Sequence, residues 1–456
     1  MIINNINPLS KIASDATFKK LYDDIQGNIL KSHARPNVQL LFLNFSQHGQ
    51  LIKNWIREKI SPIVTSFSDQ LNLSADLKSL RVFDDNGFCS FSLSKKGYDH
   101  LQILNQPDDI SFQKGLGNGT ITNDPQKTNW EDKYQEQIHA VIILGHTEKK
   151  AFKTLTARIK SILNGFATVV AEETGEAIPG EKEHFGFSDG RSQPRFFIED
   201  IAREGAVTNW NPFAPLSNAL VKDSNGKAFD GGITGNGDFP VEDFTGNHSY
   251  GSYLVFRKLE QDIDGWNNAV AQLSTSLNSP VELAGAYAVG RFKDGTPVTN
   301  HSTAQAANPI ENDFDYAADM AGAKCPFHAH IRKANPRGDT IRKFGVPLEA
   351  EKEHRISRRG IPYIDNNEKK GLLFMCYQNS IVKQFDFMQN RWVDDTNFLN
   401  PGVGIDDVIG QGTTTDKNWP VSHGAATTKS LPFGKFVTMK GGEYFFTPAI
   451  SFLKTI

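Results

Sequence analysis

A strand-then-helix unit recurs four times along this chain, twice in each half. Each unit opens with a short run of β-branched and aromatic residues, which is typical of a buried or half-buried strand. Apolar residues three and four positions apart follow, and this spacing places them on one face of a helix. We expect strands at 38–45, 138–144, 252–256 and 372–377, followed by helices that bury Leu51, Ile52, Trp55 and Ile56; Phe152, Leu155, Ile159 and Ile162; Ile263, Trp266, Val270 and Leu273; and Ile381, Phe385, Met388 and Trp392.

The repeated unit favours an α+β fold made of two similar ferredoxin-like subdomains of the dimeric α+β barrel type. Each subdomain is expected to be an antiparallel sheet with peripheral helices on one face. Two further strand candidates, 80–83 and 88–93, flank an Asp-Asn-Gly sequence at 85–87, which predicts a hairpin.

Two irregular stretches divide the chain. The segment 209–247 is rich in Gly, Asn, Asp and Pro and has no sustained apolar period. We therefore expect an N-terminal subdomain at 1–208, a connecting loop at 209–247 and a C-terminal subdomain at 248–456. The Gly- and Thr-rich stretch 401–434 is long enough to shape an active site.

Composition narrows the class of protein. The 456 residues include 38% hydrophobic residues and 32 Phe, which supports a sizeable core, and the net charge of -3 predicts no nucleic-acid partner. No run approaches the roughly 18 apolar residues of a membrane span, and the first residues do not form a signal peptide. Cys89, Cys325 and Cys376 form neither a CxxC pair nor a disulfide framework. These features predict a soluble, cytoplasmic protein without a membrane partner.

Three polar clusters carry the candidate chemistry, and the first is 184–194, His-Phe-Gly-Phe-Ser-Asp-Gly-Arg-Ser-Gln-Pro. Asp189 stands between a small residue and a glycine, within a Gly- and Phe-rich turn that is poorly suited to a core. Most Asp-Gly pairs are turn or capping residues, so Asp189 taken alone favours a structural role. A catalytic carboxylate is the alternative.

The second cluster, 325–337, holds two histidines, two arginines, a lysine and no acid. His328 and His330 would face the same side on a strand and would diverge in a loop or helix. Their spacing does not fit a helical zinc motif. A neutral imidazole is a good axial ligand for haem iron, and nearby cations could hold anionic propionates. A basic surface loop is the alternative.

The third cluster, 355–363, contains Arg358 and Arg359 followed by Gly-Ile-Pro-Tyr. Consecutive arginines usually face water. The apolar, conformationally restricted residues that follow suggest that one guanidinium turns inward.

Together these clusters resemble the dye-decolourising peroxidase family. The family's GxxDG signature matches 186–190, its proximal-histidine stretch matches 325–337, and its distal-arginine stretch matches 357–363. Nearly the whole chain is covered, because supporting stretches also match at 24–30, 251–258 and 371–378.

The resemblance implies a haem b (iron protoporphyrin IX) between the sheet and the helices of the C-terminal half. His330, rather than His328, is implied as the iron ligand, because His330 occupies the Ala-His-x-Arg-Lys position. An acidic partner behind the proximal imidazole is implied somewhere between Asp394 and Asp416.

The resemblance also implies a distal face with Asp189 and Arg358 as its catalytic residues. Asp189 would move the proton of hydrogen peroxide, and Arg358 would stabilise the negative charge that develops. Further haem contacts are implied for Leu372 and Phe374 over the distal face and for Arg332 and Arg337 at the propionates.

The implied activity is that of a haem peroxidase, which reduces hydrogen peroxide and oxidises dyes, phenols or other organic donors. Trp392 and Tyr377 could relay electrons to bulky donors, but aromatic residues at such spacing are usually core residues. Removal of iron from haem with the porphyrin left intact is one alternative function, and haem carriage or sensing is another. The distal pair Asp189 and Arg358 counts against a sensor. We expect a monomer or homodimer.

Overall fold

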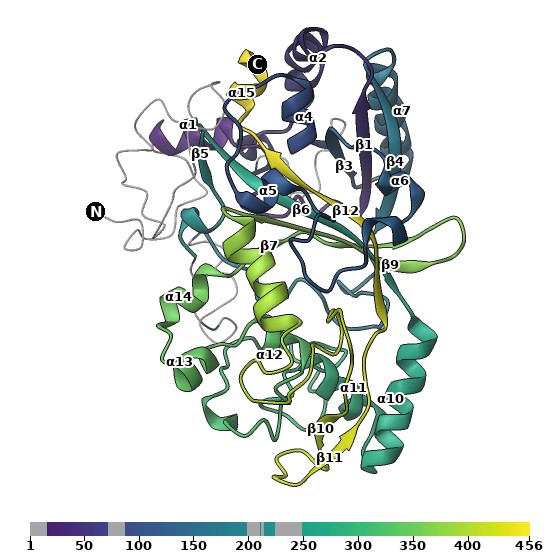
Figure 1. The fold of residues 1–456 in the computed structure, drawn as a ribbon, viewed down its shortest axis with the longest axis vertical. Coiled ribbons are helices and arrows are strands. Elements are labelled where there is room, and N and C mark those ends of the chain that lie inside the picture. The colour runs from purple at the N-terminus through teal and green to yellow at the C-terminus, as the bar shows by residue number, and fades with distance from the viewer. Residues whose placement is uncertain (1–15, 72–86, 198–209, 211–213, 224–248) are drawn as a thin grey trace.

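A computed structural model gives the structure of residues 16–71, 87–197, 210, 214–223 and 249–456 (Figure 1). The predicted strand at 80–83, and with it the predicted hairpin, lies outside the described residues. The other five predicted strands are confirmed as β1 Asn37–Phe45, β2 Phe88–Ser94, β3 Ala140–His146, β6 Ser249–Gln261 and β9 Lys370–Gln378.

These strands belong to one ten-stranded antiparallel sheet in the order β4-β1-β3-β2-β12-β6-β9-β7, in which β5 also pairs with β6 and β8 with β9. The α+β class with antiparallel strands is therefore confirmed. The sheet is completed by β4 Ala167–Glu176, β5 Val221–Asp223, β7 Ser357–Arg358, β8 Ile361–Ile364 and β12 Val437–Thr447.

The late strand β12 joins the strands of the two halves. It pairs with β6 along its whole length and with β2 through Phe445 and Phe446. Its C-terminal residues are buried, as the apolar run Tyr-Phe-Phe requires. The two expected sheets are thus continuous through β12, and the subdomain limits 1–208 and 248–456 stay a prediction.

The sheet curls so that β4 at one edge comes close to β8, which pairs with β9 near the other edge. Gly175 of β4 leaves room for the side chain of Ile361 of β8, which a Cβ at residue 175 would strike. Inside the curl, the buried Lys258 lies 3.1 Å from Glu173 of β4 and over the ring of Tyr363 of β8. Because a buried ammonium is costly unless it is paired, these contacts stabilise the curled arrangement of the sheet.

The predicted helices are present, but one residue that was predicted to be buried is exposed. Leu51 is 41% exposed, whereas Ile52, Trp55 and Ile56 are buried. These three residues repeat at offsets of three and one, and Leu51 lies on the outer side of the helix. The first three helices are α2 Gly49–Trp55, continued by a π-helical turn at Ile56–Ile60, then α7 Lys149–Leu163 and α10 Ile263–Leu277.

The fourth predicted helix has π-helical turns over Ile381–Asp386 and Met388–Val393. The wider turn changes which side chains share a face, and such turns are frequent at functional sites. Phe385, Met388 and Trp392 of this helix reach the wall of a cavity described below.

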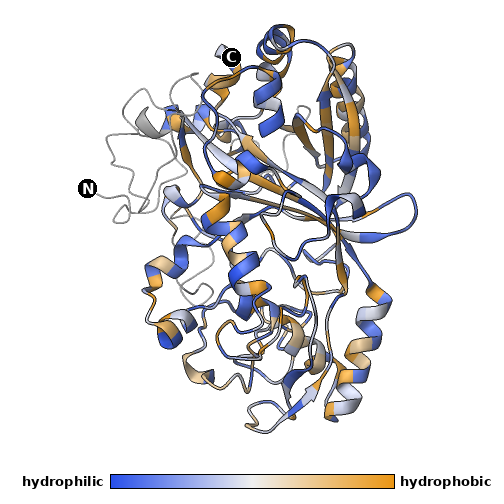
Figure 2. Ribbon diagram, in the orientation of Figure 1, coloured by the Kyte–Doolittle hydropathy of each residue, from blue (hydrophilic) through white to orange (hydrophobic). Residues whose placement is uncertain are grey.

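The helices form two groups, one on each side of the sheet in Figure 1. Figure 2 shows the strands between them as mainly hydrophobic and the helices as mixed, as expected for a sheet that is covered on both sides. No helix among the described residues is long and apolar enough to cross a membrane, and the cytoplasmic location stays a prediction. One group contains α2, α4 Lys95–His100 and α7, and the other contains α10, α11 Val281–Val289, α12 His330–Ala334, α13 Asp339–Phe344 and α14 Leu348–Glu353.

Most of the expected connection at 209–247 lies outside the described residues, and its described part includes β5. The second irregular stretch, 401–434, holds the small sheet of β10 Lys417–Pro420 and β11 Thr428–Leu431. Its earlier part brings Val408, Ile409 and Gln411 to the cavity wall.

Candidate active site

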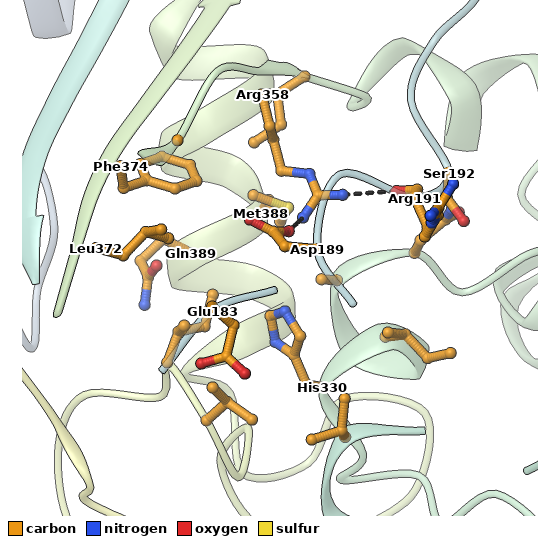
Figure 3. A pocket seen from close by; sticks show the side chains of 18 of the residues that line it. Glu183, Asp189, Arg191, Ser192, His330, Arg358, Leu372, Phe374, Met388 and Gln389 are labelled. Carbon is orange, nitrogen blue, oxygen red and sulfur yellow. Dashed lines mark hydrogen bonds and ion pairs between the residues drawn. The ribbon is translucent and has the colours of Figure 1, made fainter. Parts of the chain in front are cut away.

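A cavity of about 1800 Å3, which includes solvent space at its mouth, lies between β6, β9 and the segments that cover this side of the sheet (Figure 3). The exposed area of the wall is mainly apolar, although about half of the lining residues have polar or charged side chains. Such a combination is typical of cofactor and ligand sites. The lining includes Glu183, Asp189, Arg191, Ser192, Leu259, Gln261, His330, Arg337, Arg358, Leu372, Phe374, Phe385, Met388, Trp392, Val408 and Ile409.

His330, the first residue of α12, projects into this cavity (Figure 3). Its Nδ1 donates to Oδ2 of the buried Asp406 at 2.9 Å, so Nε2 is the ring nitrogen that can face a ligand. Asp406 is the carboxylate that fits the acidic partner implied between 394 and 416. Its Oδ1 accepts the backbone N–H groups of Val408 and Ile409 at 2.8 and 2.9 Å.

The same contacts shift the pKa of both groups. Burial alone would lower the pKa of His330, but the charge and hydrogen bond of Asp406 raise it above its ordinary value. Burial alone would raise the pKa of Asp406, but His330 and the two backbone donors bring it below its ordinary value. Asp406 is thus a strong, ionised acceptor behind the imidazole.

His328 lies outside the cavity lining, in the protein behind it. Its Nδ1 donates to Asp407 at 2.6 Å, and its Nε2 lies 3.2 Å from the carbonyl oxygen of Asn418. The two histidines diverge because the segment is a turn that enters α12, and only a strand would have aligned them.

Asp189 and Arg358 lie next to each other on the wall opposite His330 (Figure 3). Arg358 Nη1 lies 3.3 Å from Asp189 Oδ1, and Nη2 donates to the carbonyl oxygen of Arg191 at 2.6 Å. The backbone N–H of Arg358 donates to the side chain of Gln193 at 3.0 Å. About a third of each charged side chain remains exposed (30% for Arg358 and 32% for Asp189), so both can contact a small molecule.

The turn that presents Asp189 depends on its glycines. Gly186 and Gly190 have φ angles of 93° and 74°, which favour glycine over any residue with a Cβ. Asp189 Oδ1 also accepts the N–H of Gly190 at 2.6 Å. The aspartate is therefore a turn residue and a cavity residue at once, so the two interpretations of this Asp-Gly pair do not exclude each other.

Of the two adjacent arginines, only Arg358 lines the cavity. Arg359 Nε and Nη2 donate to the carbonyl oxygens of Asn28 and Ile29 at 2.6 and 2.8 Å. This contact ties the β7–β8 region to the N-terminal stretch 24–30.

Leu372 and Phe374 lie two residues apart on β9 and both line the cavity. Alternate residues of a strand point to opposite faces. Leu373 and Met375 are accordingly buried, and Leu372 and Phe374 are only half-buried because the cavity lies before them.

The position of Arg332 corrects an expectation. It is fully buried and does not line the cavity. Its Nε donates to Asp339 at 2.7 Å, and its Nη1 donates to Asp319 at 3.0 Å and to the carbonyl oxygen of Cys325 at 2.6 Å. Because two carboxylates already pair with this guanidinium, we no longer assign Arg332 to a haem propionate. It is an anchor of the segment that enters α12.

Arg337 does line the cavity, and four further arginines that we had not predicted as ligands line it as well: Arg191, Arg257, Arg291 and Arg355. Burial lowers the pKa of Arg337 to about 10 and that of Arg291 to about 9, and both remain cations at neutral pH. Arg337 donates to Ser192 Oγ at 2.7 Å and to Asn312 Oδ1 at 2.6 Å. Arg291 stands in Gly-Arg-Phe, which carries no recognisable motif.

Glu183 is another cavity residue that the sequence did not predict. Its carboxylate accepts the N–H groups of Phe185 and Phe187, both at 2.8 Å, and the amide of Gln261 at 2.6 Å. Burial raises its pKa. Glu183 therefore holds the start of the turn that presents Asp189.

Trp392 and Tyr377, the two candidate relay residues, are both buried. Trp392 lines the cavity and stacks on Phe398 with ring centroids 5.5 Å apart. Tyr377 is absent from the lining and packs within the sheet.

The π-helical wall contains a buried acid that makes stability depend on pH. Burial raises the pKa of Asp386 to about 7, although the Ser111 and Tyr444 hydroxyls donate to it. A free aspartate titrates near about 3.9, so the folded state holds this proton more tightly than the unfolded state. The free energy of unfolding should therefore fall between about pH 4 and pH 7, by at most about 4 kcal/mol for this group.

Asp386→Asn should accordingly be more stabilising at pH 8 than at pH 5, because an amide accepts from Tyr444 without carrying charge. Urea unfolding of wild type and variant at both pH values measures the difference. An effect of equal size at pH 5 and pH 8 would show that Asp386 does not titrate in this range.

Comparisons with known proteins agree with this architecture. Residues 24–179 match the family model described as the DyP dimeric alpha+beta barrel domain, and residues 236–400 match the Dyp-type peroxidase C-terminal model. The multifunctional dye peroxidase DyP2 of Amycolatopsis sp. is 34% identical over 96% of each chain. The crystal structure of a DyP-type peroxidase from Anabaena sp. is 37% identical, with a TM-score of 0.88 over 98% of this chain and 97% of that chain.

A fungal DyP-type peroxidase from Auricularia auricula-judae has the same fold at lower identity, with a TM-score of 0.76 and 26% identity over 95% of this chain and 98% of that chain. Fold, site and relatives together define an oxidoreductase of the peroxidase class. The chain belongs to the dye-decolourising peroxidase family.

Proposed function

We propose that this protein is a haem b peroxidase that reduces hydrogen peroxide and oxidises dyes, phenols or other organic donors. The observation that carries the proposal is the arrangement of one cavity, with the His330–Asp406 pair on one wall and the Asp189–Arg358 pair on the opposite wall.

The residues present fit a haem. The mainly apolar wall suits the porphyrin, Nε2 of His330 is available to the iron, and Arg337 supplies a cation for a propionate. Leu372 and Phe374 would pack against the ring on the side of Asp189. When bound, the haem iron supplies the redox chemistry that splits peroxide and withdraws electrons from the donor.

Asp189 acts as the distal acid and base in this proposal. An ionised carboxylate accepts the proton from one oxygen of peroxide and returns it to the leaving oxygen. The turn of Gly186 and Gly190 presents Asp189, and the hydrogen bonds of Glu183 hold that turn.

Arg358 stabilises the negative charge that develops as the O–O bond breaks. Its guanidinium is always charged, so this role does not depend on pH. The hydrogen bonds to Arg191 and Gln193 fix both its side chain and its backbone before peroxide arrives. A donor that is already oriented costs no reorganisation during the reaction.

His330 would hold the iron, and the hydrogen bond to Asp406 makes its imidazole a stronger donor of electron density. A metal-bound histidine usually donates its second N–H to a carboxylate or carbonyl, which fixes the ring and raises its basicity. The buried Asp406, held by two backbone N–H groups, suits this task.

The test is turnover of the haem-loaded protein with hydrogen peroxide and an artificial dye. Rapid oxidation that needs both haem and peroxide is expected. Iron release without an external electron donor would instead favour the removal of iron from haem as the activity. A relative that matches part of the chain is the reason to consider this alternative. The deferrochelatase of Yersinia pestis is 30% identical over 147 residues, which is 27% of this chain and 32% of that protein.

Asp189→Asn should slow the pre-steady-state reaction with peroxide by about 100-fold or more, because asparagine keeps the shape of the side chain but cannot accept the proton. Stopped-flow mixing of the ferric protein with peroxide measures the rate in wild type and variant. A variant that keeps the wild-type rate would leave Asp189 with the structural turn role alone.

A further inference from the structure

A second His–Asp pair lies directly behind the proximal wall, and the proposed reaction does not use it. His328, Asp407 and Lys417 are 3%, 0% and 0% exposed. Asp407 Oδ2 accepts from His328 Nδ1 at 2.6 Å, and Asp407 Oδ1 accepts from Lys417 Nζ. Because a buried carboxylate without partners is destabilising, the cluster is a mutually satisfied unit.

This cluster connects the same two segments as the His330–Asp406 pair. His328 and His330 come from the turn that enters α12, and Asp406 and Asp407 are adjacent in the loop beyond the π-helix. The backbone N–H of Asp407 also lies 3.4 Å from the carbonyl oxygen of His328. Two parallel His–Asp hydrogen bonds, one facing the cavity and one buried, therefore cross-link the two segments.

The buried His328–Asp407 hydrogen bond supplies a restraint that the hydrogen bonds made by Asp406 to its own loop do not supply. Val408 and Ile409 orient the Asp406 carboxylate relative to its own loop. They do not set the distance between that loop and α12. His328 helps to set that distance, together with Lys333 of α12, which donates to the carbonyl oxygen of Gly404 at 2.6 Å. The ring of His328 is itself held edge-on to Trp419, with centroids 4.4 Å apart.

We propose that His328, together with Asp407 and Lys417, is a positioning residue that keeps Asp406 at hydrogen-bond distance from His330 and so sets the electron donation of the proximal imidazole. The inference rests on the proposed function, in which His330 binds the iron. Loss of the buried bond removes the restraint on the residue next to Asp406, while Lys333 still holds Gly404. The His330–Asp406 hydrogen bond is then weakened without removal of either partner.

The test compares His328→Leu, His328→Asn and wild type in the haem-loaded form. Leucine keeps apolar volume against Trp419 but donates nothing. Asparagine can place an amide N–H near the position of Nδ1. His328→Leu should bind haem, lower the iron–histidine stretching frequency of the ferrous protein in resonance Raman, and make the ferric/ferrous reduction potential more positive. The peroxide reaction should slow roughly 10- to 100-fold, as for other outer-shell contacts.

His328→Asn should return both spectroscopic values most of the way to wild type. In an Asp406→Asn background, His328→Leu should add no further shift, since the effect acts through Asp406. His139 is a buried histidine that packs against Phe45 and His100 and does not line the cavity, and it provides the matched control. His139→Leu should cost stability and leave the iron–histidine band and the potential unchanged.

An unchanged band and potential in His328→Leu would overturn the inference, and so would a full additional shift in the Asp406→Asn background. If His328→Leu does not accumulate as a haem protein, Lys417→Met must shift the band in the same direction and His328→Asn must not. An iron–histidine band that survives in His330→Ala would instead refute the proposed function itself.

Discussion

Replacement of His330 by alanine should remove most of the bound haem, whereas replacement of His328 by alanine should leave the haem complement intact. His330 is the histidine that lines the cavity with Nε2 available, and the ring of His328 is hydrogen-bonded at both nitrogens in the protein behind it. The imidazole of His330 would supply this chain's bond to the iron of a b-type haem.

The measurement is haem content per chain and the Soret band after reconstitution of both variants under the same conditions. The His328 variant is the matched control, because it removes an imidazole two residues away. The assignment of the iron ligand is wrong if His328→Ala loses haem while His330→Ala keeps an unaltered Soret band.

Arg358→Leu should slow the formation of the first oxidised state by about 100-fold or more, because one preorganised donor to a developing charge typically contributes that much. The natural control is Arg359→Leu. Arg359 holds the carbonyl oxygens of Asn28 and Ile29, so its loss should lower the thermal stability and leave the rate nearly unchanged.

Stopped-flow mixing of the ferric protein with excess peroxide measures the rate in both variants. A normal rate in Arg358→Leu together with a large loss in Arg359→Leu would move the charge-stabilising role by one residue. A large loss in both variants would show that the N-terminal stretch 24–30 also shapes the distal wall.

The sequence predicted the strands best where both faces of the strand are buried. The runs that became β1, β3, β6 and β9 are nearly continuous apolar segments, so packing and periodicity agree. The sequence could not indicate that β12 joins β2 to β6, because strand pairing over more than 300 positions leaves no local pattern. The same limit applies to the curl of the sheet, which depends on Gly175 meeting Ile361.

Side-chain direction was the main limit at the site. The motif placed Arg332 and Arg337 in one basic segment, and only the fold distinguishes a guanidinium paired with Asp319 and Asp339 from one that lines the cavity. The interval 394–416 contains Asp394, Asp395, Asp406, Asp407 and Asp416, and the sequence alone could not choose among them. Glu183 and Arg291 lacked any motif, and proximity to the cavity is what identifies them.

The central place of β12 has a consequence for biosynthesis. The strand at 437–447 is synthesised after β2 and β6, yet it lies between them and hydrogen-bonds both. Each half can form its local hairpins and helices during translation, but the complete sheet needs this late segment. Pairing between such distant residues is also slow, since a large loop must close first. The proposed haem site should therefore be complete only after residues 437–447 have joined the sheet, and truncation before residue 437 should give a product that cannot retain haem.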